Sequence, residues 1–266
     1  MNEECEMDRR EGKECPKLGQ EQERIDDIGF SGFRIIQRPK EFCYGIDAVL
    51  LSDFAKVKDG GRICDLGTGT GIIPLILRHK TKASEICGIE LQKNSYDLAL
   101  RNVELNGLER ELHMFHGDVL DGVQMLGKGC FDTVVTNPPY TAPGEGMKSN
   151  NEAKRLARHE STATLQDFVR VAADLLKDKG NFYLVHRPSR LVDIMMACRQ
   201  YRLEPKLIRM VAPRVGVQPN ILLLHCVKYG NPELLWLPTL YVYDGEKGYT
   251  KEIDQIYERD KNLKTI

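Results

Sequence analysis

The chain has 266 residues, 41% hydrophobic and 29% charged, which is typical of one sizeable soluble domain with extensions. Its 38 Lys/Arg and 39 Asp/Glu give a formal net charge of −1, which excludes a chain that simply coats nucleic acid. No apolar run reaches the roughly 20 residues of a membrane span, and the acidic N-terminus lacks the apolar core of a signal peptide.

The distribution of cysteines and charges narrows the class further. The eight cysteines form no Cys-x-x-Cys pair, which predicts reduced thiols in a cytoplasmic protein and no metal site. Residues 1–29 hold 5 Lys/Arg and 10 Asp/Glu, which leaves 33 and 29 for the rest of the chain. The mildly basic body permits RNA binding without requiring it.

The N-terminal part divides into a tail and a short structured segment. Residues 1–27 are polar and aperiodic, and we expect a disordered acidic tail. Residues 28–37 predict two short strands around a glycine turn. From Ile46 the apolar positions recur at helical spacing, with Asp47 near the positive end of the helix dipole and Tyr44-Gly45 as the turn before it.

A strand, a glycine-rich turn and a helix follow one another at residues 62–77. The strand places Asp65 near its end, and the turn reads Gly67-Thr68-Gly69-Thr70-Gly71. Glycines permit positive φ and let a ligand lie against bare backbone. The spacing differs from the G-x-G-x-x-G of dinucleotide-binding folds, and Asp65 puts a negative charge where a cationic ligand would lie.

Two further acids stand at the ends of the next two strands. Glu90 can accept hydrogen bonds from both hydroxyls of a ribose, or cap the next helix. Asp118 can accept from an adenine amino group, or serve as the N-cap of a short helix. Three acids after three successive strands form a far rarer pattern than any one of them.

The following strand, residues 131–136, runs into Asn137-Pro138-Pro139-Tyr140, at the sheet edge where open α/β folds bind ligands. The prolines lack N–H donors and exclude a helix, which leaves backbone carbonyls free. The Asn137 amide oxygen and the Pro138 carbonyl can hold the two N–H bonds of a conjugated amino group, while Tyr140 can stack on a planar ring. This arrangement suits methylation of such a nitrogen by positioning, and an ordinary turn is the alternative interpretation.

Residues 141–160 form a long polar segment next to this motif. We predict that basic residues there contact phosphates, although a solvated loop with routine charges is the alternative. The predicted RNA contacts are Lys148, Lys154, Arg155, Arg158, His159 and, further along, Arg187.

The remaining elements continue the alternation of helix and strand and end in a hairpin-like strand pair at 206–211 and 221–227. Residues 241–250 predict a small β-turn-β before a short helix. The alternation implies a parallel sheet with right-handed crossovers. We divide the chain into the tail 1–27, a hairpin and helix at 28–58, a main α/β domain at 59–230 and a C-terminal extension at 231–266.

These motifs together resemble those of class I S-adenosylmethionine-dependent methyltransferases that act on amino nitrogens. The resemblance covers about residues 28–256 and implies a Rossmann-like α/β fold, with a seven-stranded, mostly parallel sheet, helices on both faces and an antiparallel last strand. It assigns the glycines Gly67, Gly69 and Gly71 to the methionine end of the cofactor, Glu90 to its ribose and Asp118 to its adenine. Asn137, Pro138 and Tyr140 are then the catalytic residues, with Asn137 also touching the cofactor.

A narrower resemblance is to the bacterial tRNA adenine-N6 methyltransferases of the valine-tRNA type, which act on adenine 37, just 3′ of the anticodon. It rests on residues 42–51, on Ala157-Arg158-His159-Glu160, and on Pro213-Arg214 with Pro219-Asn220. In that family the segment before the glycine loop helps to enclose S-adenosylmethionine, which implies cofactor contacts from Tyr44 and Asp47. The resemblance implies a tRNA anticodon loop as partner, and we favour a monomer.

Three alternatives stay open from the sequence. N5-methylation of a release-factor glutamine uses the same loop, although no separate N-terminal helical domain is visible. Methylation of a guanine N2 in ribosomal RNA shares the fold and a similar loop. A catalytically idle RNA- or cofactor-binding module is the third, and such a copy would be expected to have lost Gly67, Gly69 or Asn137.

Overall fold

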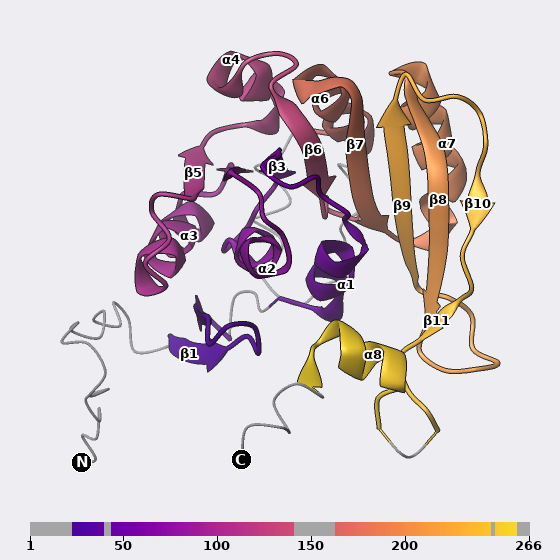
Figure 1. The fold of residues 1–266 in the computed structure, drawn as a ribbon, viewed down its shortest axis with the longest axis horizontal. Coiled ribbons are helices and arrows are strands. Elements are labelled where there is room, and N and C mark those ends of the chain that lie inside the picture. Colours follow the sequence, from indigo (N-terminus) through magenta and orange to yellow (C-terminus); the bar gives the residue numbers. More distant parts are fainter. Residues whose placement is uncertain (1–22, 40–43, 141–162, 246–247, 260–266) are drawn as a thin grey trace, which may run out of the picture.

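A computed structural model describes residues 23–39, 44–140, 163–245 and 248–259 and shows a twisted sheet between two layers of helices (Figure 1). Seven strands lie in the order β5-β4-β3-β6-β7-β9-β8. The last of them in the chain, β9, runs antiparallel to β7 and β8, and the predicted fold class is confirmed. The strands are β3 (Arg62–Leu66), β4 (Glu85–Glu90), β5 (Leu112–His116), β6 (Phe131–Thr136), β7 (Leu176–His186), β8 (Leu203–Ala212) and β9 (Ile221–Lys228).

The C-terminal extension adds two strands at the outer edge of β8, so the sheet has nine strands. Both β10 (Leu235–Trp236) and β11 (Leu240–Tyr241) pair parallel with β8. Strands of two residues are too short to show the alternation from which a strand is predicted. In place of the predicted β-turn-β, a single antiparallel bridge joins Tyr243 to Tyr249, and the short helix α8 (Lys251–Ile256) follows it.

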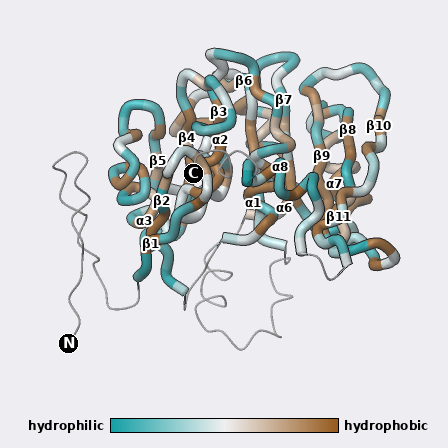
Figure 2. The backbone as a smooth tube through the Cα atoms, turned by 60° about the horizontal axis from the view of Figure 1, so that its bottom comes forward, coloured by the Kyte–Doolittle hydropathy of each residue, from teal (hydrophilic) through white to brown (hydrophobic). Residues whose placement is uncertain are grey.

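Two hydrophobic clusters pack the helices onto opposite faces of the sheet. Figure 2 shows the hydrophobic stretches gathered along the central strands. One face carries α1 (Ile46–Phe54), α2 (Ile72–Lys80), α3 (Lys93–Leu105) and α8. The other face carries α4 (Gly122–Leu126), α6 (Leu165–Leu175) and α7 (Leu191–Gln200).

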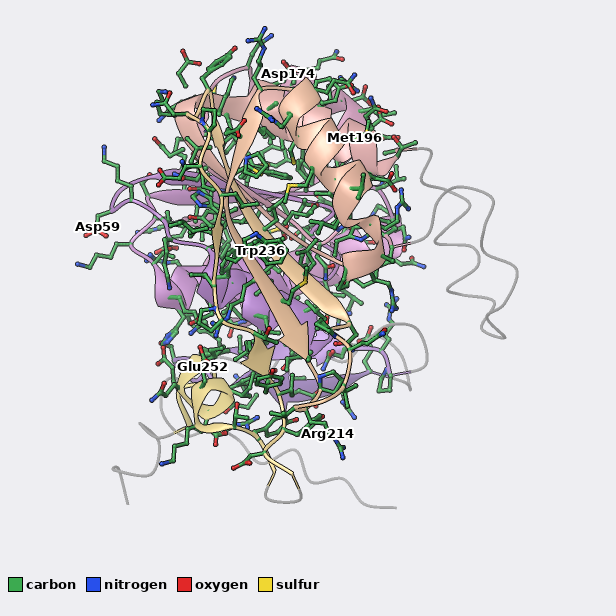
Figure 3. All side chains as sticks on the ribbon, turned by 90° about the vertical axis from the view of Figure 1, so that its right-hand side faces the viewer. Asp59, Asp174, Met196, Arg214, Trp236 and Glu252 are labelled. Carbon is green, nitrogen blue, oxygen red and sulfur yellow. The ribbon has the colours of Figure 1, made fainter. Side chains whose placement is uncertain are left out.

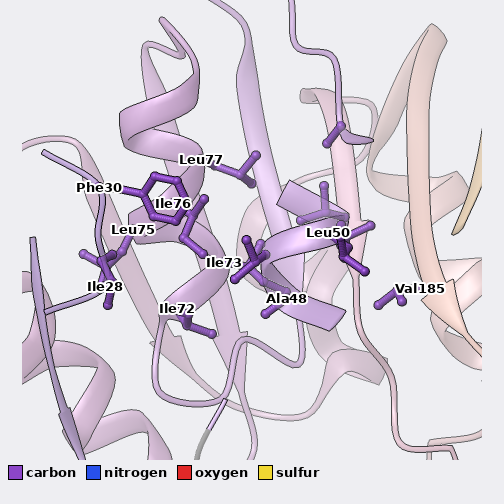
Figure 4. Packing of buried hydrophobic residues seen from close by; sticks show 14 of the residues in the cluster. Ile28, Phe30, Ala48, Leu50, Ile72, Ile73, Leu75, Ile76, Leu77 and Val185 are labelled. Carbon is purple, nitrogen blue, oxygen red and sulfur yellow. The ribbon is translucent and has the colours of Figure 1, made fainter. Parts of the chain in front are cut away.

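Helix α2 is enclosed on every side, because all its residues from Ile72 to Leu77 are buried. A helix that is apolar all round must be covered all round. Helix α1 packs beside it, and the N-terminal hairpin places Phe30 on its other side (Figure 4). The Phe30 ring also contacts the ring of His79, with 5.4 Å between centroids. The segment before the glycine loop is therefore part of the main hydrophobic core.

The N-terminal hairpin begins earlier than the sequence predicted. Strand β1 (Arg24–Asp27) pairs with β2 (Arg34–Gln37), so residues 23–27 are folded rather than part of the expected disordered tail, and the chain turns between the two strands. The Glu23 carboxylate is fully buried between the guanidinium groups of Arg38 and Arg101, each at 2.9 Å. Arg101 lies on α3, so this contact has no local sequence signal. Residues 1–22 lie outside the described residues.

One buried side chain joins the hairpin, the glycine loop and α3. The Asn102 amide oxygen accepts from the Ile36 N–H at 2.7 Å, and the amide nitrogen donates to the Thr70 carbonyl at 2.9 Å. One turn later, the Asn106 side chain makes the same kind of contacts to the backbone of Arg34, but at the surface. Asn102 and Asn106 therefore form a matched pair for mutagenesis, because they make similar contacts but differ in burial.

Asn102→Ala should lower the free energy of unfolding by about 2–6 kcal/mol, because it leaves two buried backbone groups unsatisfied at about 1–3 kcal/mol each. Asn106→Ala should cost about 1 kcal/mol or less, because water can replace its exposed contacts. Urea denaturation of both variants measures the difference. Equal losses of unfolding free energy in the two variants would contradict the assigned role of Asn102 in joining the hairpin to the glycine loop.

Candidate active site

The glycine loop between β3 and α2 has the backbone that its sequence predicts. Gly67, Gly69 and Gly71 have φ of +75°, +59° and +84°, a region that favours glycine. A Cβ on Gly71 would lie 3.5 Å from that of Ala99 on α3, and one on Gly67 would lie 3.4 Å from the Phe168 ring. A Cβ on Gly69 would meet no described atom within 4 Å. The backbone at Gly69 therefore presents an open face to a ligand.

The end of β4 shapes this loop. The Ile89 carbonyl accepts from the N–H groups of Gly67 and Thr68, each at 3.0 Å. The buried Glu90 carboxylate accepts from the Gly69 N–H and from the Gln92 N–H, each at 2.8 Å. Burial raises the pKa of Glu90, and the hydrogen bonds from Gln92 and Gly69 oppose that rise. Each oxygen keeps an acceptor position after these bonds, so a ribose can still be held there.

Asp65 is a buried carboxylate without a hydrogen-bond partner. It is fully buried, and neither oxygen accepts a hydrogen bond from the described residues. Burial raises the pKa of Asp65, the neighbouring Thr68 hydroxyl lowers it and the charge of Glu90 raises it, and together these effects bring it to about 7. That hydroxyl approaches without the geometry of a hydrogen bond. Such a group is stabilised by a cation or a donor brought by a ligand.

Asp118 occupies the position that the sequence predicted, past the end of β5. Its side chain accepts from the Leu120 N–H at 2.9 Å and caps the short helix η1 (Val119–Asp121). The capping interpretation is therefore correct for one oxygen. A carboxylate has acceptor positions beyond this single bond, so capping leaves contact with an adenine amino group possible.

The strand that carries Asn137 lies directly beside the strand that carries the glycine loop. Thr136, at the end of β6, pairs with Leu66 of β3, and its hydroxyl donates to the Leu66 carbonyl at 2.8 Å. Asn137 is half-buried and Pro138 is buried. The chain therefore leaves β6 next to the point where it enters Gly67.

Tyr140 connects this motif to α1. Its hydroxyl donates to the Asp47 carboxylate at the start of that helix. Burial and the charge of Asp47 raise the pKa of Tyr140, so the phenol stays protonated and keeps donating. Two residues that the sequence assigned separately, one to catalysis and one to cofactor enclosure, are in direct contact. Tyr44 lies just before α1, where its N–H donates to the Gln37 side chain at 3.1 Å.

The ring of Tyr140 contacts two residues at the end of β7. The His186 ring lies 5.0 Å from it, and the Arg187 guanidinium lies 5.2 Å from its centroid. The His186 Nδ1 atom accepts from the Arg187 N–H, so any ring proton is on Nε2. Burial, followed by the charge of Arg190, lowers the pKa of His186 to about 4, so this ring is neutral near pH 7.

Sequence reasoning missed His186 and gave Arg187 only an RNA contact. The available signal was the one that identified Glu90 and Asn137, since His186 is the last residue of a parallel strand. The predicted RNA contacts Lys148, Lys154, Arg155, Arg158 and His159 lie outside the described residues.

The fold and this constellation define a class I S-adenosylmethionine-dependent methyltransferase. Residues 35–197 match the model of the methyltransferase small domain family. The chain is 30% identical to the tRNA1(Val) (adenine(37)-N6)-methyltransferase of Porphyromonas gingivalis, over 67% of this chain and 71% of that protein. It is 34% identical to the enzyme of that name in Flavobacterium johnsoniae, over 57% and 63% of the two chains. The chain belongs to the family of tRNA1(Val) (adenine(37)-N6)-methyltransferases.

Solved structures show the same fold. A predicted O-methyltransferase of Agrobacterium tumefaciens superposes with a TM-score of 0.66 at 22% identity, covering 80% of this chain and 95% of the other. The geranyl diphosphate C-methyltransferase of Streptomyces coelicolor, solved with S-adenosyl-L-homocysteine, gives 0.51 at 14% identity over 69% and 78%.

Three further observations concern cysteines, metal sites and membrane-spanning helices among the described residues. The five cysteines described are free thiols. In the same part of the chain, no three His, Cys, Asp or Glu side chains gather as a metal site. None of the helices described there has the length and apolar character needed to cross a bilayer.

The residues at this edge fit S-adenosylmethionine, which is the cofactor of this class. It is a cationic nucleoside, and the edge offers an unpaired buried carboxylate at Asp65, acceptor positions on Glu90 and an open backbone at Gly69. When bound, S-adenosylmethionine supplies an electrophilic methyl group on its sulfonium.

Asp65→Asn should stabilise the cofactor-free protein at pH 8 by about 2–4 kcal/mol, because one pKa unit corresponds to about 1.4 kcal/mol. The folded-state pKa lies above the unfolded value of about 3.9, so the wild type loses stability as pH rises from about 4 to 7. The advantage of the variant should therefore vanish near pH 4. Urea denaturation of both proteins at pH 4, 6 and 8 measures it, and a difference that does not change with pH would contradict an unpaired Asp65.

Proposed function

We propose that the chain transfers a methyl group from S-adenosylmethionine to N6 of adenine 37 in a valine tRNA, as a monomer in the cytoplasm. The observation that carries the proposal is the placement of Asn137-Pro138-Pro139-Tyr140 at the carboxyl end of β6, directly beside the glycine loop. The names of the relatives support tRNA as the substrate.

In this proposal, the first three strand ends and the segment before them hold the cofactor. Gly67, Gly69 and Gly71 receive its methionine end, and Asp65 faces its positive charge. Glu90 accepts from the ribose and Asp118 from the adenine amino group. Tyr44, just before α1, and Asp47, at the start of α1, enclose the cofactor. A negative pocket in a low-dielectric setting favours a cationic ligand more strongly than the same charges would in water.

The Asn137 amide oxygen and the Pro138 carbonyl accept the two N–H bonds of the adenine amino group and turn its lone pair toward the methyl group. The N6 nitrogen is a weak nucleophile because its lone pair is delocalised into the ring. Holding it in line supplies a large part of the rate gain, and well-oriented reactants can gain roughly 7–11 kcal/mol. The neutral His186 is not needed as a base, because the methylated nitrogen is acidic and loses its proton late.

Tyr140 is the platform for the base in this proposal. Its hydroxyl is fixed by Asp47, so the ring is held in one orientation. One contact of the ring is now taken by Arg187, and a stacked adenine would displace that guanidinium toward the RNA backbone. A nucleotide of a single-stranded loop leaves its stack at lower cost than one in a duplex. Lys148, Lys154, Arg155, Arg158 and His159 remain predicted RNA contacts.

Asn137→Ala should abolish methyl transfer, with a loss of at least about a hundredfold in kcat, because one acceptor for the reacting nitrogen is gone. The affinity for S-adenosylmethionine should change little. Tyr140→Phe is the matched control: it keeps the ring and removes the bond to Asp47, so it should retain part of the activity. Single-turnover transfer and equilibrium cofactor binding separate the two effects, and an active Asn137→Ala protein would refute the assigned role.

The substrate is tested by incubating the protein and labelled S-adenosylmethionine, in parallel, with total tRNA, with ribosomal RNA and with the protein fraction of a strain that lacks this protein. Labelled N6-methyladenosine in one tRNA is the expected product. Label in a protein glutamine, or in guanine of ribosomal RNA, would instead select one of the two alternatives with the same loop. A melting temperature that S-adenosylmethionine leaves unchanged would contradict cofactor binding altogether.

A further inference from the structure

A cleft lies at the end of the sheet opposite the candidate active site, where the parallel strands begin. It has a volume of about 230 Å³ and is lined by residues that precede β6 and β8, by the end of α6 and by the end of β9. All of these lie away from the carboxyl ends of the parallel strands. Figure 3 shows this separation, with Asp174 of the cleft at one end of the molecule and Arg214, just past the carboxyl end of β8, at the other.

Positive charge dominates the cleft. Four of its residues are cationic, namely Lys128, Arg170, Arg202 and Lys228, and Asp174 is its one carboxylate. Asp174 already pairs with Lys128 at 3.1 Å. Three cations are therefore left without a carboxylate inside the cleft itself.

Lys228 carries the argument, because it is a buried cation. The residue is 8% exposed, and its ammonium group donates to the Leu176 carbonyl at 2.8 Å. Its other described contact is with the ring of Tyr229, at 5.5 Å. Within the described residues, no carboxylate pairs with it. A buried cation in this state is stabilised by an anion that enters the cleft.

Arg170, on α6, and Arg202, in the turn between α7 and β8, complete the set. Among the residues that the structure describes, Arg170 pairs with one carboxylate, that of Asp167 at 3.4 Å on its own helix. The Arg202 guanidinium has no carboxylate partner in the described part of the chain. Arg202 has φ of +63° and Tyr229 has φ of +53°, and the Tyr229 N–H donates to the Arg202 carbonyl at 2.8 Å. Both residues hold a conformation that non-glycine residues rarely adopt, and it places them together at the cleft.

We propose that this cleft binds a phosphate group. Arginine and lysine are the side chains that proteins use for phosphate, and Arg170, Arg202 and Lys228 line one small cavity from three separate segments of the chain. The volume lies below the 300–1,000 Å³ typical of pockets for larger ligands, so it suits a phosphate with part of its sugar. The phosphate belongs either to a free nucleotide or to the backbone of an RNA, and the RNA source rests on the proposed function.

The test measures binding of inorganic phosphate, UMP and a tRNA transcript by titration calorimetry. UMP is used because its base does not match an adenine site. Arg202→Gln and Arg170→Gln should each weaken phosphate or UMP binding about tenfold or more, since each removes a charge-assisted hydrogen bond. Arg24→Gln is the matched control, because Arg24 is a surface arginine paired with Asp26 away from the cleft, and it should bind like the wild type.

The outcomes separate the two sources. Weaker UMP binding with unchanged tRNA binding identifies a free nucleotide as the ligand. Weaker tRNA binding, with a salt dependence shallower by about one unit per lost contact, identifies an RNA phosphate. Unchanged binding of all three probes in both variants would overturn the site. Asn137→Ala should bind phosphate like the wild type, so failure of this site and failure of the proposed function are distinguishable.

Discussion

The candidate active site depends on how the end of β4 fixes the loop that follows β3. One carbonyl, that of Ile89, accepts two successive N–H groups, and the next residue, Glu90, takes a third N–H of the loop at Gly69. A loop held this way needs positive φ at its glycines, which is why those residues stand there. Its far end is fixed by the buried Asn102, which also holds the N-terminal hairpin. The glycine loop, the N-terminal hairpin and α3 are therefore held together as one unit.

Two buried acidic side chains in the candidate active site make an unfavourable electrostatic contribution to the stability of the protein without a ligand. Asp65 and Glu90 are two buried acids close enough for the charge of one to raise the pKa of the other. Neither faces a basic side chain across a salt bridge in the described structure. In the proposed function, the positive charge that faces Asp65 comes with S-adenosylmethionine. Active sites commonly accept such a cost in stability in return for binding.

The parts of the fold and site that the sequence predicted are those with local signals. Gly67, Gly69 and Gly71 follow a strand within a few residues, and Asn137 follows another strand, so both positions could be predicted from neighbours. The boundary of the tail was wrong because Glu23 is held by Arg101, 78 residues away. His186 was missed although its place at the end of a parallel strand is a local signal, whereas the cleft around Lys228 was missed because four separate segments form it. Contacts between distant segments leave no trace in a single sequence.

The position of β9 has a consequence for how the chain is made. β9 lies between β7 and β8 although it follows both in the sequence, so β7 has an unpaired edge until β9 has been synthesised. A nascent chain that ends after α7 holds most of the site and an open, apolar strand. Open edges of this kind recruit other strands and lead to aggregation. Synthesis of Ile221–Lys228 therefore covers the exposed edge of β7 and removes this risk of aggregation. It comes well after the residues of the candidate active site have been synthesised.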